Sequence, residues 1–209
     1  MQLTKYEHAC FTVEKDDKLL VVDPGEWSSD FIAPAGVVAI VVTHNHGDHF
    51  DHEQLEAIIN ENPNAIIVAP ETVTSEIEVF NTETVDAGDT LDIGPFHLEF
   101  FGGKHAVIHS SLPIATNVGV MVNDLLYYPG DSFTLPGRAV DTLALPVSAP
   151  WLKISETIDF LSQIRPRLAF PTHDAILSDI GKELVDGRLG DTAGKQGTTY
   201  QRLTESILI

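Results

Sequence analysis

The sequence predicts a single mixed α/β domain, and three observations support this prediction. The 209 residues correspond to one large domain or two small ones, and no linker-like or low-complexity stretch divides the chain. Short β-branched and aromatic runs, which are typical of strands, alternate with segments of helical periodicity. Hydrophobic residues make up 43% and charged residues 21%, which is the balance of an ordinary globular core.

Strand patterns dominate the first half of the chain. The predicted strands are Ala9–Val13, Lys18–Val22, Val37–Val42, Ala65–Ala69 and Leu91–Phe101, the last interrupted at Gly94. A helix is expected after Asp51, which can cap its first turn. A second helix is expected after Pro70, where Val73, Ile77 and Phe80 would share one face.

The second half combines strands with one predicted helix. The predicted strands are Val118–Val122, Leu125–Tyr128, Leu143–Leu145 and Leu168–Phe170, the first two forming a hairpin. The helix is expected to begin at a Ser155 cap and to stop before Pro166. Lys18–Glu26 and Asp124–Ser132 both contain a strand, a Pro-Gly turn and a carboxylate, which suggests a duplicated β half.

The charge of the chain argues against several classes of partner. Twelve Lys and Arg residues stand against 31 Asp and Glu residues, so the net charge is −19, whereas nucleic acids and anionic membranes attract basic surfaces. The single cysteine, Cys10, excludes an intramolecular disulfide and fits a reducing compartment. No apolar leader or membrane-length segment is present. We therefore expect a soluble cytoplasmic protein that binds neither nucleic acid nor membrane.

A cluster of metal-ligand residue types follows the predicted strand that ends at Val42. Three histidines and one aspartate lie within six residues, at His44, His46, Asp48 and His49. If the backbone stays extended, the first two histidines lie on the same side of the chain. Gly47 then allows a sharp turn, so that Asp48 and His49 can address a second point nearby.

Three further candidate ligands follow later predicted strands in the same way: His105, Asp131 and His173. Side chains at several strand ends can meet in one cleft. Imidazole and carboxylate together suit zinc, iron or manganese. Such a cluster would be costly for stability alone, because its polar groups must lose water without gaining partners. The pattern therefore predicts a metal site.

The segment Thr43–His49, THNHGDH, resembles the HxHxDH signature of the metallo-β-lactamase superfamily. GKHA at 103–106, PGDS at 129–132 and PTHD at 171–174 follow in the order and spacing of that family's other metal motifs. The resemblance covers nearly the whole chain and implies a four-layer αββα sandwich, the metallo-β-lactamase fold, over residues 1–209. Within the superfamily, GGKHAVIH resembles the small hydrolase branch that includes L-ascorbate-6-phosphate lactonase.

The resemblance also implies the cofactor and the reaction. The implied cofactors are two divalent metal ions, with zinc first and manganese or iron as alternatives. The first ion is assigned to His44, His46 and His105, the second to Asp48, His49 and His173, with Asp131 bridging both. A hydroxide between the ions would cleave an ester, lactone or phosphoester bond in a small molecule. The candidate catalytic residues are Asp48, Asp131 and His109.

Several alternatives stay open from the sequence. The same centre could serve a phosphodiesterase or nuclease, but such an enzyme would need basic stripes that this chain lacks. His109 lies either toward the substrate or in a solvated loop, and His8 has either a structural or a functional role. Asp23 either caps a turn or orients a ligand histidine, and Trp151 lines the cleft or fills a core edge. The resemblance allows a homo-oligomer.

Overall fold

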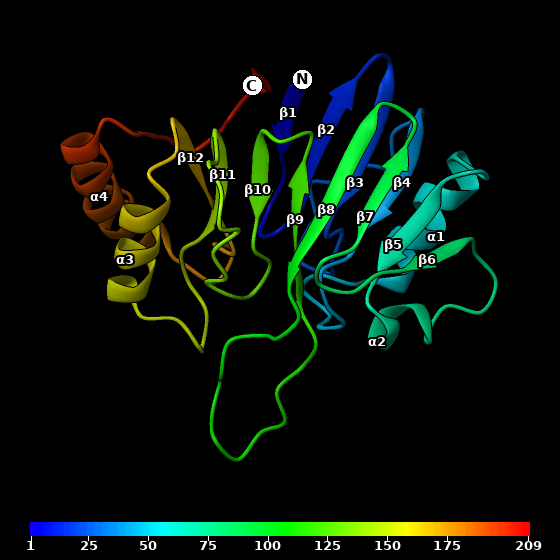
Figure 1. Cartoon of the computed structure of the whole chain (residues 1–209), viewed down its shortest axis with the longest axis horizontal. Coiled ribbons are helices and arrows are strands. Elements are labelled where there is room, and N and C mark those ends of the chain that lie inside the picture. Colours follow the sequence, from blue (N-terminus) through cyan, green and yellow to red (C-terminus); the bar gives the residue numbers. More distant parts are fainter.

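Two seven-stranded sheets pack face to face, and helices cover their outer faces (Figure 1). The computed structural model describes residues 1–209. The first sheet contains, in spatial order, β14 (Ile207–Leu208), β1 (Gln2–Lys5), β2 (Phe11–Lys15), β3 (Lys18–Val22), β4 (Val37–Val41), β5 (Ile66–Ala69) and β6 (Thr82–Thr84). The second contains β13 (Thr199–Tyr200), β12 (Leu168–Thr172), β11 (Thr142–Pro146), β10 (Leu126–Tyr128), β9 (Val118–Val122), β8 (Phe96–Gly102) and β7 (Thr90–Ile93).

The two sheets repeat one arrangement of strands. In the first sheet the hairpin β2–β3 is antiparallel, and β3 then pairs in parallel with β4. In the second sheet the hairpin β9–β10 is antiparallel, and β10 then pairs in parallel with β11. Asn123 and Asp124 form the turn of the second hairpin with positive φ angles of 51° and 57°, as short hairpin turns require. The repeated arrangement agrees with the duplication suggested by the sequence.

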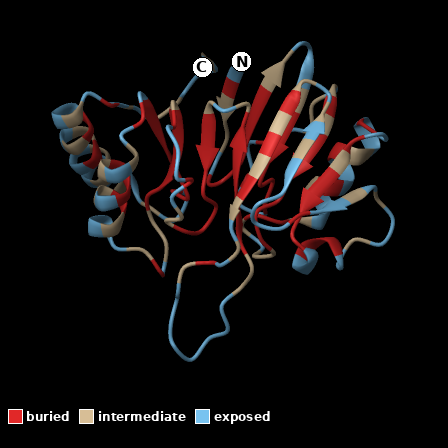
Figure 2. Cartoon of the chain, in the orientation of Figure 1, coloured by how far each residue is buried: buried red, intermediate tan, exposed pale blue.

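The hydrophobic core forms three layers between and outside the sheets. A central cluster of 19 buried residues joins the inner faces, with Phe11 of β2 packing edge-to-face on Tyr128 of β10. Outside the first sheet lie helices α1 (His52–Glu61) and α2 (Glu71–Thr74). Outside the second lie α3 (Ile154–Ile164) and α4 (Asp179–Gln196). The buried strands in Figure 2 are thus covered on both faces, which confirms the predicted αββα sandwich.

Two predicted helices differ in the structure, and a further helix is present that the sequence did not predict. The helix expected to continue to Phe80 ends at Thr74, because the chain turns back to place β6 beside β5. Helix α3 begins at Ile154 rather than after Ser155, and the Lys153 amide donates to the Glu156 carboxylate at 3.1 Å. Helix α4 was not predicted, because only two of its 18 residues are buried and four are glycines.

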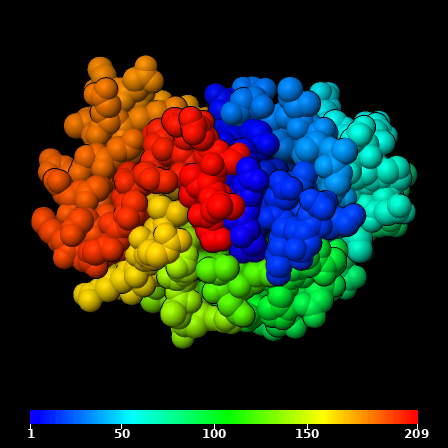
Figure 3. Space-filling model, turned by 90° about the horizontal axis from the view of Figure 1, so that it is seen from above, coloured from blue at the N-terminus to red at the C-terminus, as the bar shows by residue number.

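The two ends of the chain meet at one face of the molecule. Strand β1 pairs with β14, and the space-filling view shows the N-terminal and C-terminal segments side by side (Figure 3). The amino group of Met1 donates to the carbonyl oxygen of Ile209 at 3.0 Å. No helix in the structure combines the length and apolar character that a membrane crossing requires.

Candidate metal centre

The candidate ligands gather at the edge of the sandwich from which the long loop 103–117 projects (Figure 1). His44, His105, Asp131 and His173 follow strands β4, β8, β10 and β12, respectively. Their ligand atoms fall into two groups of four, and within each group the atoms lie no more than 4.8 Å apart. The first group is His44, His46, His105 and Asp131, and the second is His8, Asp48, His49 and His173. The structure therefore brings together all seven predicted metal ligands and adds His8.

Asp131 lies between the two groups. One of its carboxylate oxygens, Oδ2, is 3.2 Å from Nε2 of His105 and 3.0 Å from Nε2 of His173. Its other oxygen, Oδ1, is 3.2 Å from Nε2 of His49. This position agrees with the bridging place that the family resemblance implies for Asp131.

The outer nitrogen of three histidines faces a group that only accepts hydrogen bonds. Nδ1 of His49 lies 2.7 Å from the Asp23 carboxylate, Nδ1 of His105 lies 2.5 Å from the Ala106 carbonyl oxygen, and Nδ1 of His173 lies 2.5 Å from the Ser148 carbonyl oxygen. Each Nδ1 must therefore carry the proton. In their neutral form the rings then present Nε2 lone pairs to the cluster, as metal-binding histidines do.

Asp23 sets the tautomer of a fourth histidine through Thr43. The Thr43 hydroxyl donates to Asp23 at 2.8 Å, so its oxygen accepts from Nδ1 of His44 at 3.0 Å. The lone pair of His44 is therefore on Nε2, which lies 3.1 Å from Nδ1 of His46 and 4.0 Å from Oδ2 of Asp131. Asp23 therefore has the orienting role that the sequence left open, because it holds His49 directly and His44 through Thr43.

Several buried atoms of the cluster lack a hydrogen-bond partner. They are Nε2 of His49, Nε2 of His173 and Oδ1 of Asp131. Buried polar atoms without partners are costly, and a divalent ion would satisfy all three. The donor set of five imidazoles and two carboxylates suits zinc, manganese or iron. The residues present thus fit the metals that the sequence predicted.

The electrostatics of the cluster keep its carboxylates ionised. Burial tends to raise the pKa of Asp131, but the neighbouring His49 and His173 hold that pKa well below its usual range. Burial would lower the pKa of His173, but Asp131 and Asp48 raise it to about 9 when no cation neutralises them. Burial and the surrounding histidines lower the pKa of His44. The two carboxylates therefore attract positive charge, whether from protons or from metal ions.

His8 is a further member of the cluster, and its role was one that the sequence left open. It has a positive φ of 55°, and its ring packs against that of His173 with centroids 4.1 Å apart and the planes tilted by 57°. The Ala175 amide donates to Nδ1 of His8 at 3.4 Å, so Nε2 carries the proton and donates to Oδ2 of Asp48 at 3.0 Å. Burial lowers the pKa of His8 to about 4, which keeps the ring neutral. His8 is therefore a hydrogen-bond donor that orients Asp48.

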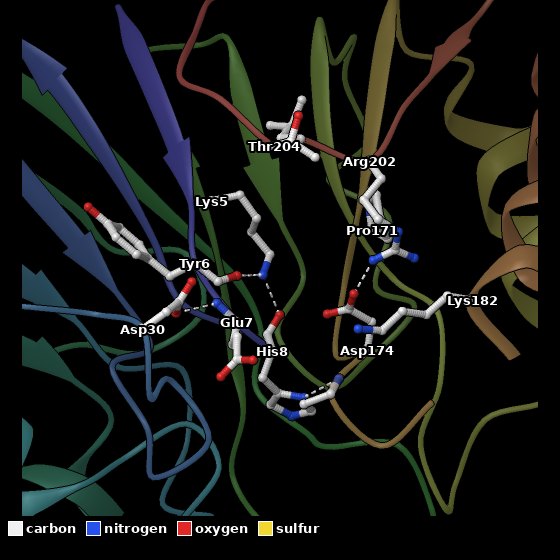
Figure 4. Close-up of a pocket in the computed structure, with 12 residues that line it drawn as sticks. Lys5, Tyr6, Glu7, His8, Asp30, Pro171, Asp174, Lys182, Arg202 and Thr204 are labelled. Carbon is white, nitrogen blue, oxygen red and sulfur yellow. Dashed lines mark hydrogen bonds and ion pairs between the residues drawn. The ribbon is translucent and has the colours of Figure 1, made fainter. Parts of the chain in front are cut away.

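A cavity of about 230 Å³ lies beside the main chain of His8, and the residues that line it hold His8 in place (Figure 4). Lys5 extends across the cavity and donates to the main-chain carbonyl oxygens of Tyr6 and His8. The His8 carbonyl oxygen also accepts from the His173 amide at 3.0 Å. Arg202 and Asp174 form an ion pair on the opposite wall. The main chain at His8 is thus hydrogen-bonded to that of His173, the first residue after β12.

A cleft of about 220 Å³ opens onto the metal-ligand cluster. Its walls include His46, Asp48, Asp131 and the indole of Trp151. Nε1 of Trp151 donates to Oδ2 of Asp131 at 2.8 Å. Trp151 therefore lines the cleft, as one of the two sequence-based alternatives expected, and also holds the bridging carboxylate.

His109 is the predicted site residue that the structure leaves outside this cleft. It lies on the exposed part of the loop after β8, and its Nδ1 is 2.7 Å from the Ser111 hydroxyl. The main-chain amide of His105 donates a hydrogen bond to the carbonyl oxygen of Ala115, which holds His105 against the body of the protein. The loop then becomes exposed before His109. The structure thus places His109 on a solvated part of the loop, which is the second of the two sequence-based alternatives.

Comparisons with known proteins agree with this architecture. A model of the beta-lactamase superfamily domain matches residues 2–173. Protein Rv0786c of Mycobacterium tuberculosis is 38% identical over 215 residues, covering 100% of this chain and 99% of that protein. A UPF0173 metal-dependent hydrolase of Aeropyrum pernix is 29% identical over 203 residues, covering 82% of this chain and 81% of the relative. The metallo-beta-lactamase fold protein YhfI of Bacillus subtilis has a TM-score of 0.74 at 13% identity, covering 99% of this chain and 98% of that one.

The chain belongs to the beta-lactamase superfamily, since the family model spans most of its length. The metallo-β-lactamase fold is that of YhfI as well. Within the superfamily, the chain is a metal-dependent hydrolase, the class that its motifs predicted. The finer resemblance to the branch that includes L-ascorbate-6-phosphate lactonase stays a prediction.

Proposed function

We propose that residues 1–209 form one catalytic domain that hydrolyses an ester, lactone or phosphoester bond of a small molecule at a two-metal centre. The observation that carries the proposal is the arrangement of the histidine protons. Four imidazoles have Nδ1 bound to an acceptor, so four Nε2 lone pairs converge on the space around Asp131. Structural histidines have no need of this shared orientation, whereas metal ligands require it.

The chain's own residues would hold two ions at the positions of the two groups. His44, His46 and His105 would hold the first, Asp48, His49 and His173 the second, and Asp131 both. We propose zinc, manganese or iron as the ions, because this donor set suits all three. Bound ions of this kind supply an activated water nucleophile and polarise the bond to be cleaved.

Residues around the ligands then orient the centre and exclude water. Asp23, His8 and Trp151 each hydrogen-bond to a ligand side chain, and so fix the directions in which the lone pairs point. Buried strand ends carry these groups, so that little reorganisation is needed during the reaction. Asp48 and Asp131 both line the cleft, and the Asp48 side chain is the more exposed of the two. We propose Asp48 and Asp131 as the catalytic carboxylates.

The size and charge of the cleft support a small substrate. A volume of about 220 Å³ is below the usual range of roughly 300–1,000 Å³ for drug-sized ligands. No lysine or arginine lines the cleft, and the chain has a net charge of −19. A nucleic acid requires basic contacts along its backbone, so these features disfavour a nuclease.

Metal analysis combined with hydrolysis assays tests the proposal. We expect purified protein to contain a transition metal near two equivalents, or to gain hydrolytic activity when zinc or manganese is added. A lactone and ester panel assayed beside a chromogenic phosphodiester separates the bond types. Absence of metal together with absence of any metal-stimulated hydrolysis would contradict the proposal.

Variants of the ligands give a second test. Asp48→Ala and His173→Ala should abolish hydrolysis while circular dichroism shows a folded protein. The matched control is His109→Ala, because this exposed histidine lies outside the cleft and its loss should leave the activity unchanged. Full activity of both ligand variants would show that catalysis occurs elsewhere.

A further inference from the structure

Three exposed apolar side chains form a rim around the mouth of the cleft. They are Trp27, Ile108 and Ile176, with 41%, 42% and 48% of their surface exposed. Trp27 lies after β3, Ile108 in the loop after β8, and Ile176 between β12 and α4. Three segments distant in the sequence each contribute one large apolar side chain. The rim is therefore an apolar patch and not a single exposed hydrophobic residue.

The rim is continuous with the metal-ligand cluster. The same cavity that touches these three side chains also touches His46, Asp48 and Asp131. A group that packed on the rim would therefore place its neighbouring atoms within reach of the candidate ligands. This continuity favours a part of the substrate as the occupant, because a macromolecular partner would not need access to the cluster.

Lysine and arginine are absent from the lining of the cleft. The only carboxylates that line it belong to the metal-ligand set, and no lysine or arginine is present to bind a phosphate or a second carboxylate. The stretch from His105 to Asn123 contains no Asp, Glu, Lys or Arg, in a chain with 43 such residues elsewhere. The cleft thus has apolar walls that suit an uncharged group.

We propose that the rim binds an uncharged apolar group, a short alkyl chain or an aromatic ring, attached next to the carbonyl of an ester or lactone substrate. The inference rests on the proposed hydrolytic function and narrows it to apolar acyl substrates. Trp27, Ile108 and Ile176 are then residues that determine specificity. A cleft of about 220 Å³ restricts the apolar group to a short one.

A chain-length series of esters tests this proposal. The probes are p-nitrophenyl acetate and p-nitrophenyl hexanoate, assayed with the metal-loaded protein. A fully buried methylene changes binding by about fourfold, so four partly buried methylenes should raise kcat/KM by about tenfold or more. The two leaving groups are identical, so the ratio reports contact with the acyl chain alone.

Two variants and two matched controls locate the effect. Ile108→Ser and Ile176→Ser should each reduce the preference for hexanoate by about threefold or more while the acetate rate changes little. Leu112→Ser, in the same loop as Ile108, and Leu184→Ser, on α4, remove apolar side chains that are 50% and 64% exposed and lie outside the cleft. These controls should keep the wild-type preference, and all four variants should keep the metal content and melting temperature.

A binding experiment separates failure of this inference from failure of the proposed function. Titration with sodium hexanoate and sodium acetate, followed by the fluorescence of the two tryptophans, compares the same carboxylate with and without an alkyl chain. If no ester is hydrolysed but hexanoate binds more tightly and Ile108→Ser removes the difference, the ester function fails and the apolar subsite stands.

Two results would overturn the apolar subsite itself. One is equal kcat/KM for acetate and hexanoate together with equal binding of the two acids. The other is a concentration-dependent dimer in sedimentation that Ile108→Ser abolishes, because the rim would then be a contact between two copies of the chain.

Discussion

Replacement of Asp23 by asparagine would alter the tautomer of His49 without changing the shape of the site. Asp23 is fully buried and accepts three hydrogen bonds. They come from the Thr43 amide at 2.8 Å, the Thr43 hydroxyl at 2.8 Å and Nδ1 of His49 at 2.7 Å. Asparagine has the same size, but one of its two terminal atoms becomes a donor.

Either orientation of the new amide sets a donor against a donor. If its NH₂ group occupies the place of Oδ2, Nδ1 of His49 must accept and the proton moves to Nε2, the atom 3.2 Å from Asp131. If the NH₂ group occupies the place of Oδ1, it faces the Thr43 amide. A hydrogen bond to a charged group contributes about 1.5–3 kcal/mol, so we expect Asp23→Asn to lower the free energy of unfolding by about 3 kcal/mol. Metal affinity should fall by about 10–100-fold.

Urea unfolding in the presence of a chelator measures the first effect, and competition with a chromogenic chelator measures the second. Nitrogen-15 NMR of the imidazoles reports the tautomer directly. The matched control is Asp92→Asn, because Asp92 binds Nδ1 of His97 at 2.6 Å but is 80% exposed. A surface pair of this kind contributes at most about 1 kcal/mol and touches no ligand. Unchanged metal affinity in Asp23→Asn, or an equal loss in Asp92→Asn, would refute the role assigned to Asp23.

Three further changes test other parts of the site. Gly25→Ala should destabilise the protein by about 3 kcal/mol and lower its metal content, because a Cβ there would overlap the main-chain carbonyl of Asp48. Thermal melting measures the change in stability. The control is Gly187→Ala on α4, where a Cβ meets open space and should stabilise the protein by up to about 1 kcal/mol. Trp151→Phe keeps a ring in the cleft but loses the N–H bond to Asp131, so metal affinity should fall about tenfold by chelator competition, and an unchanged affinity would contradict that role. The metal-free pKa of His173 is about 9, so at pH 7 its ring carries a proton that zinc must displace. Zinc binding at pH 7 should therefore release protons, and the affinity for zinc should rise about tenfold per pH unit for each proton released, up to pH 9. Calorimetry in buffers of different ionisation enthalpy measures this release, and an absence of proton release would contradict the assigned charge state.

The sequence contained enough information to predict the central strands and the ligand set. Strands β3 and β4 are apolar runs that lie in a buried sheet, so their composition and their position agree. Ligands that directly follow such strands inherit a well-defined place at the sheet edge. His173, for example, is the first residue after β12, and His44 is the third residue after β4.

The contributions of His8, Asp23 and α4 depend on contacts that local sequence does not specify. His8 reaches Asp48 because the turn at residues 7–10 has a positive φ at His8 and is anchored by Lys5, which is a tertiary arrangement. The role of Asp23 could not be decided from the sequence, because capping of the Asp-Pro-Gly turn alone explains an aspartate at this position. Helix α4 has weak amphipathicity, since it contacts the body mainly through Leu189 and Ala193. The position of His109 could not be decided from the sequence, because proximity to His105 along the chain does not indicate the direction of an exposed loop.

The duplicated strand arrangement explains why His49 occupies the middle of the site. Asp23 follows β3 of the first sheet, and Asp131 follows β10, its counterpart in the second. His49 lies between them, with Nδ1 2.7 Å from Asp23 and Nε2 3.2 Å from Asp131. Asp23 thus fixes the ring of His49 through Nδ1, and Asp131 lies near Nε2, at the position proposed for the metals. Because one imidazole is in contact with both sheets, any displacement of one sheet edge relative to the other would move a ligand. The tight central core between the sheets is therefore a requirement of the metal centre as well as of the fold.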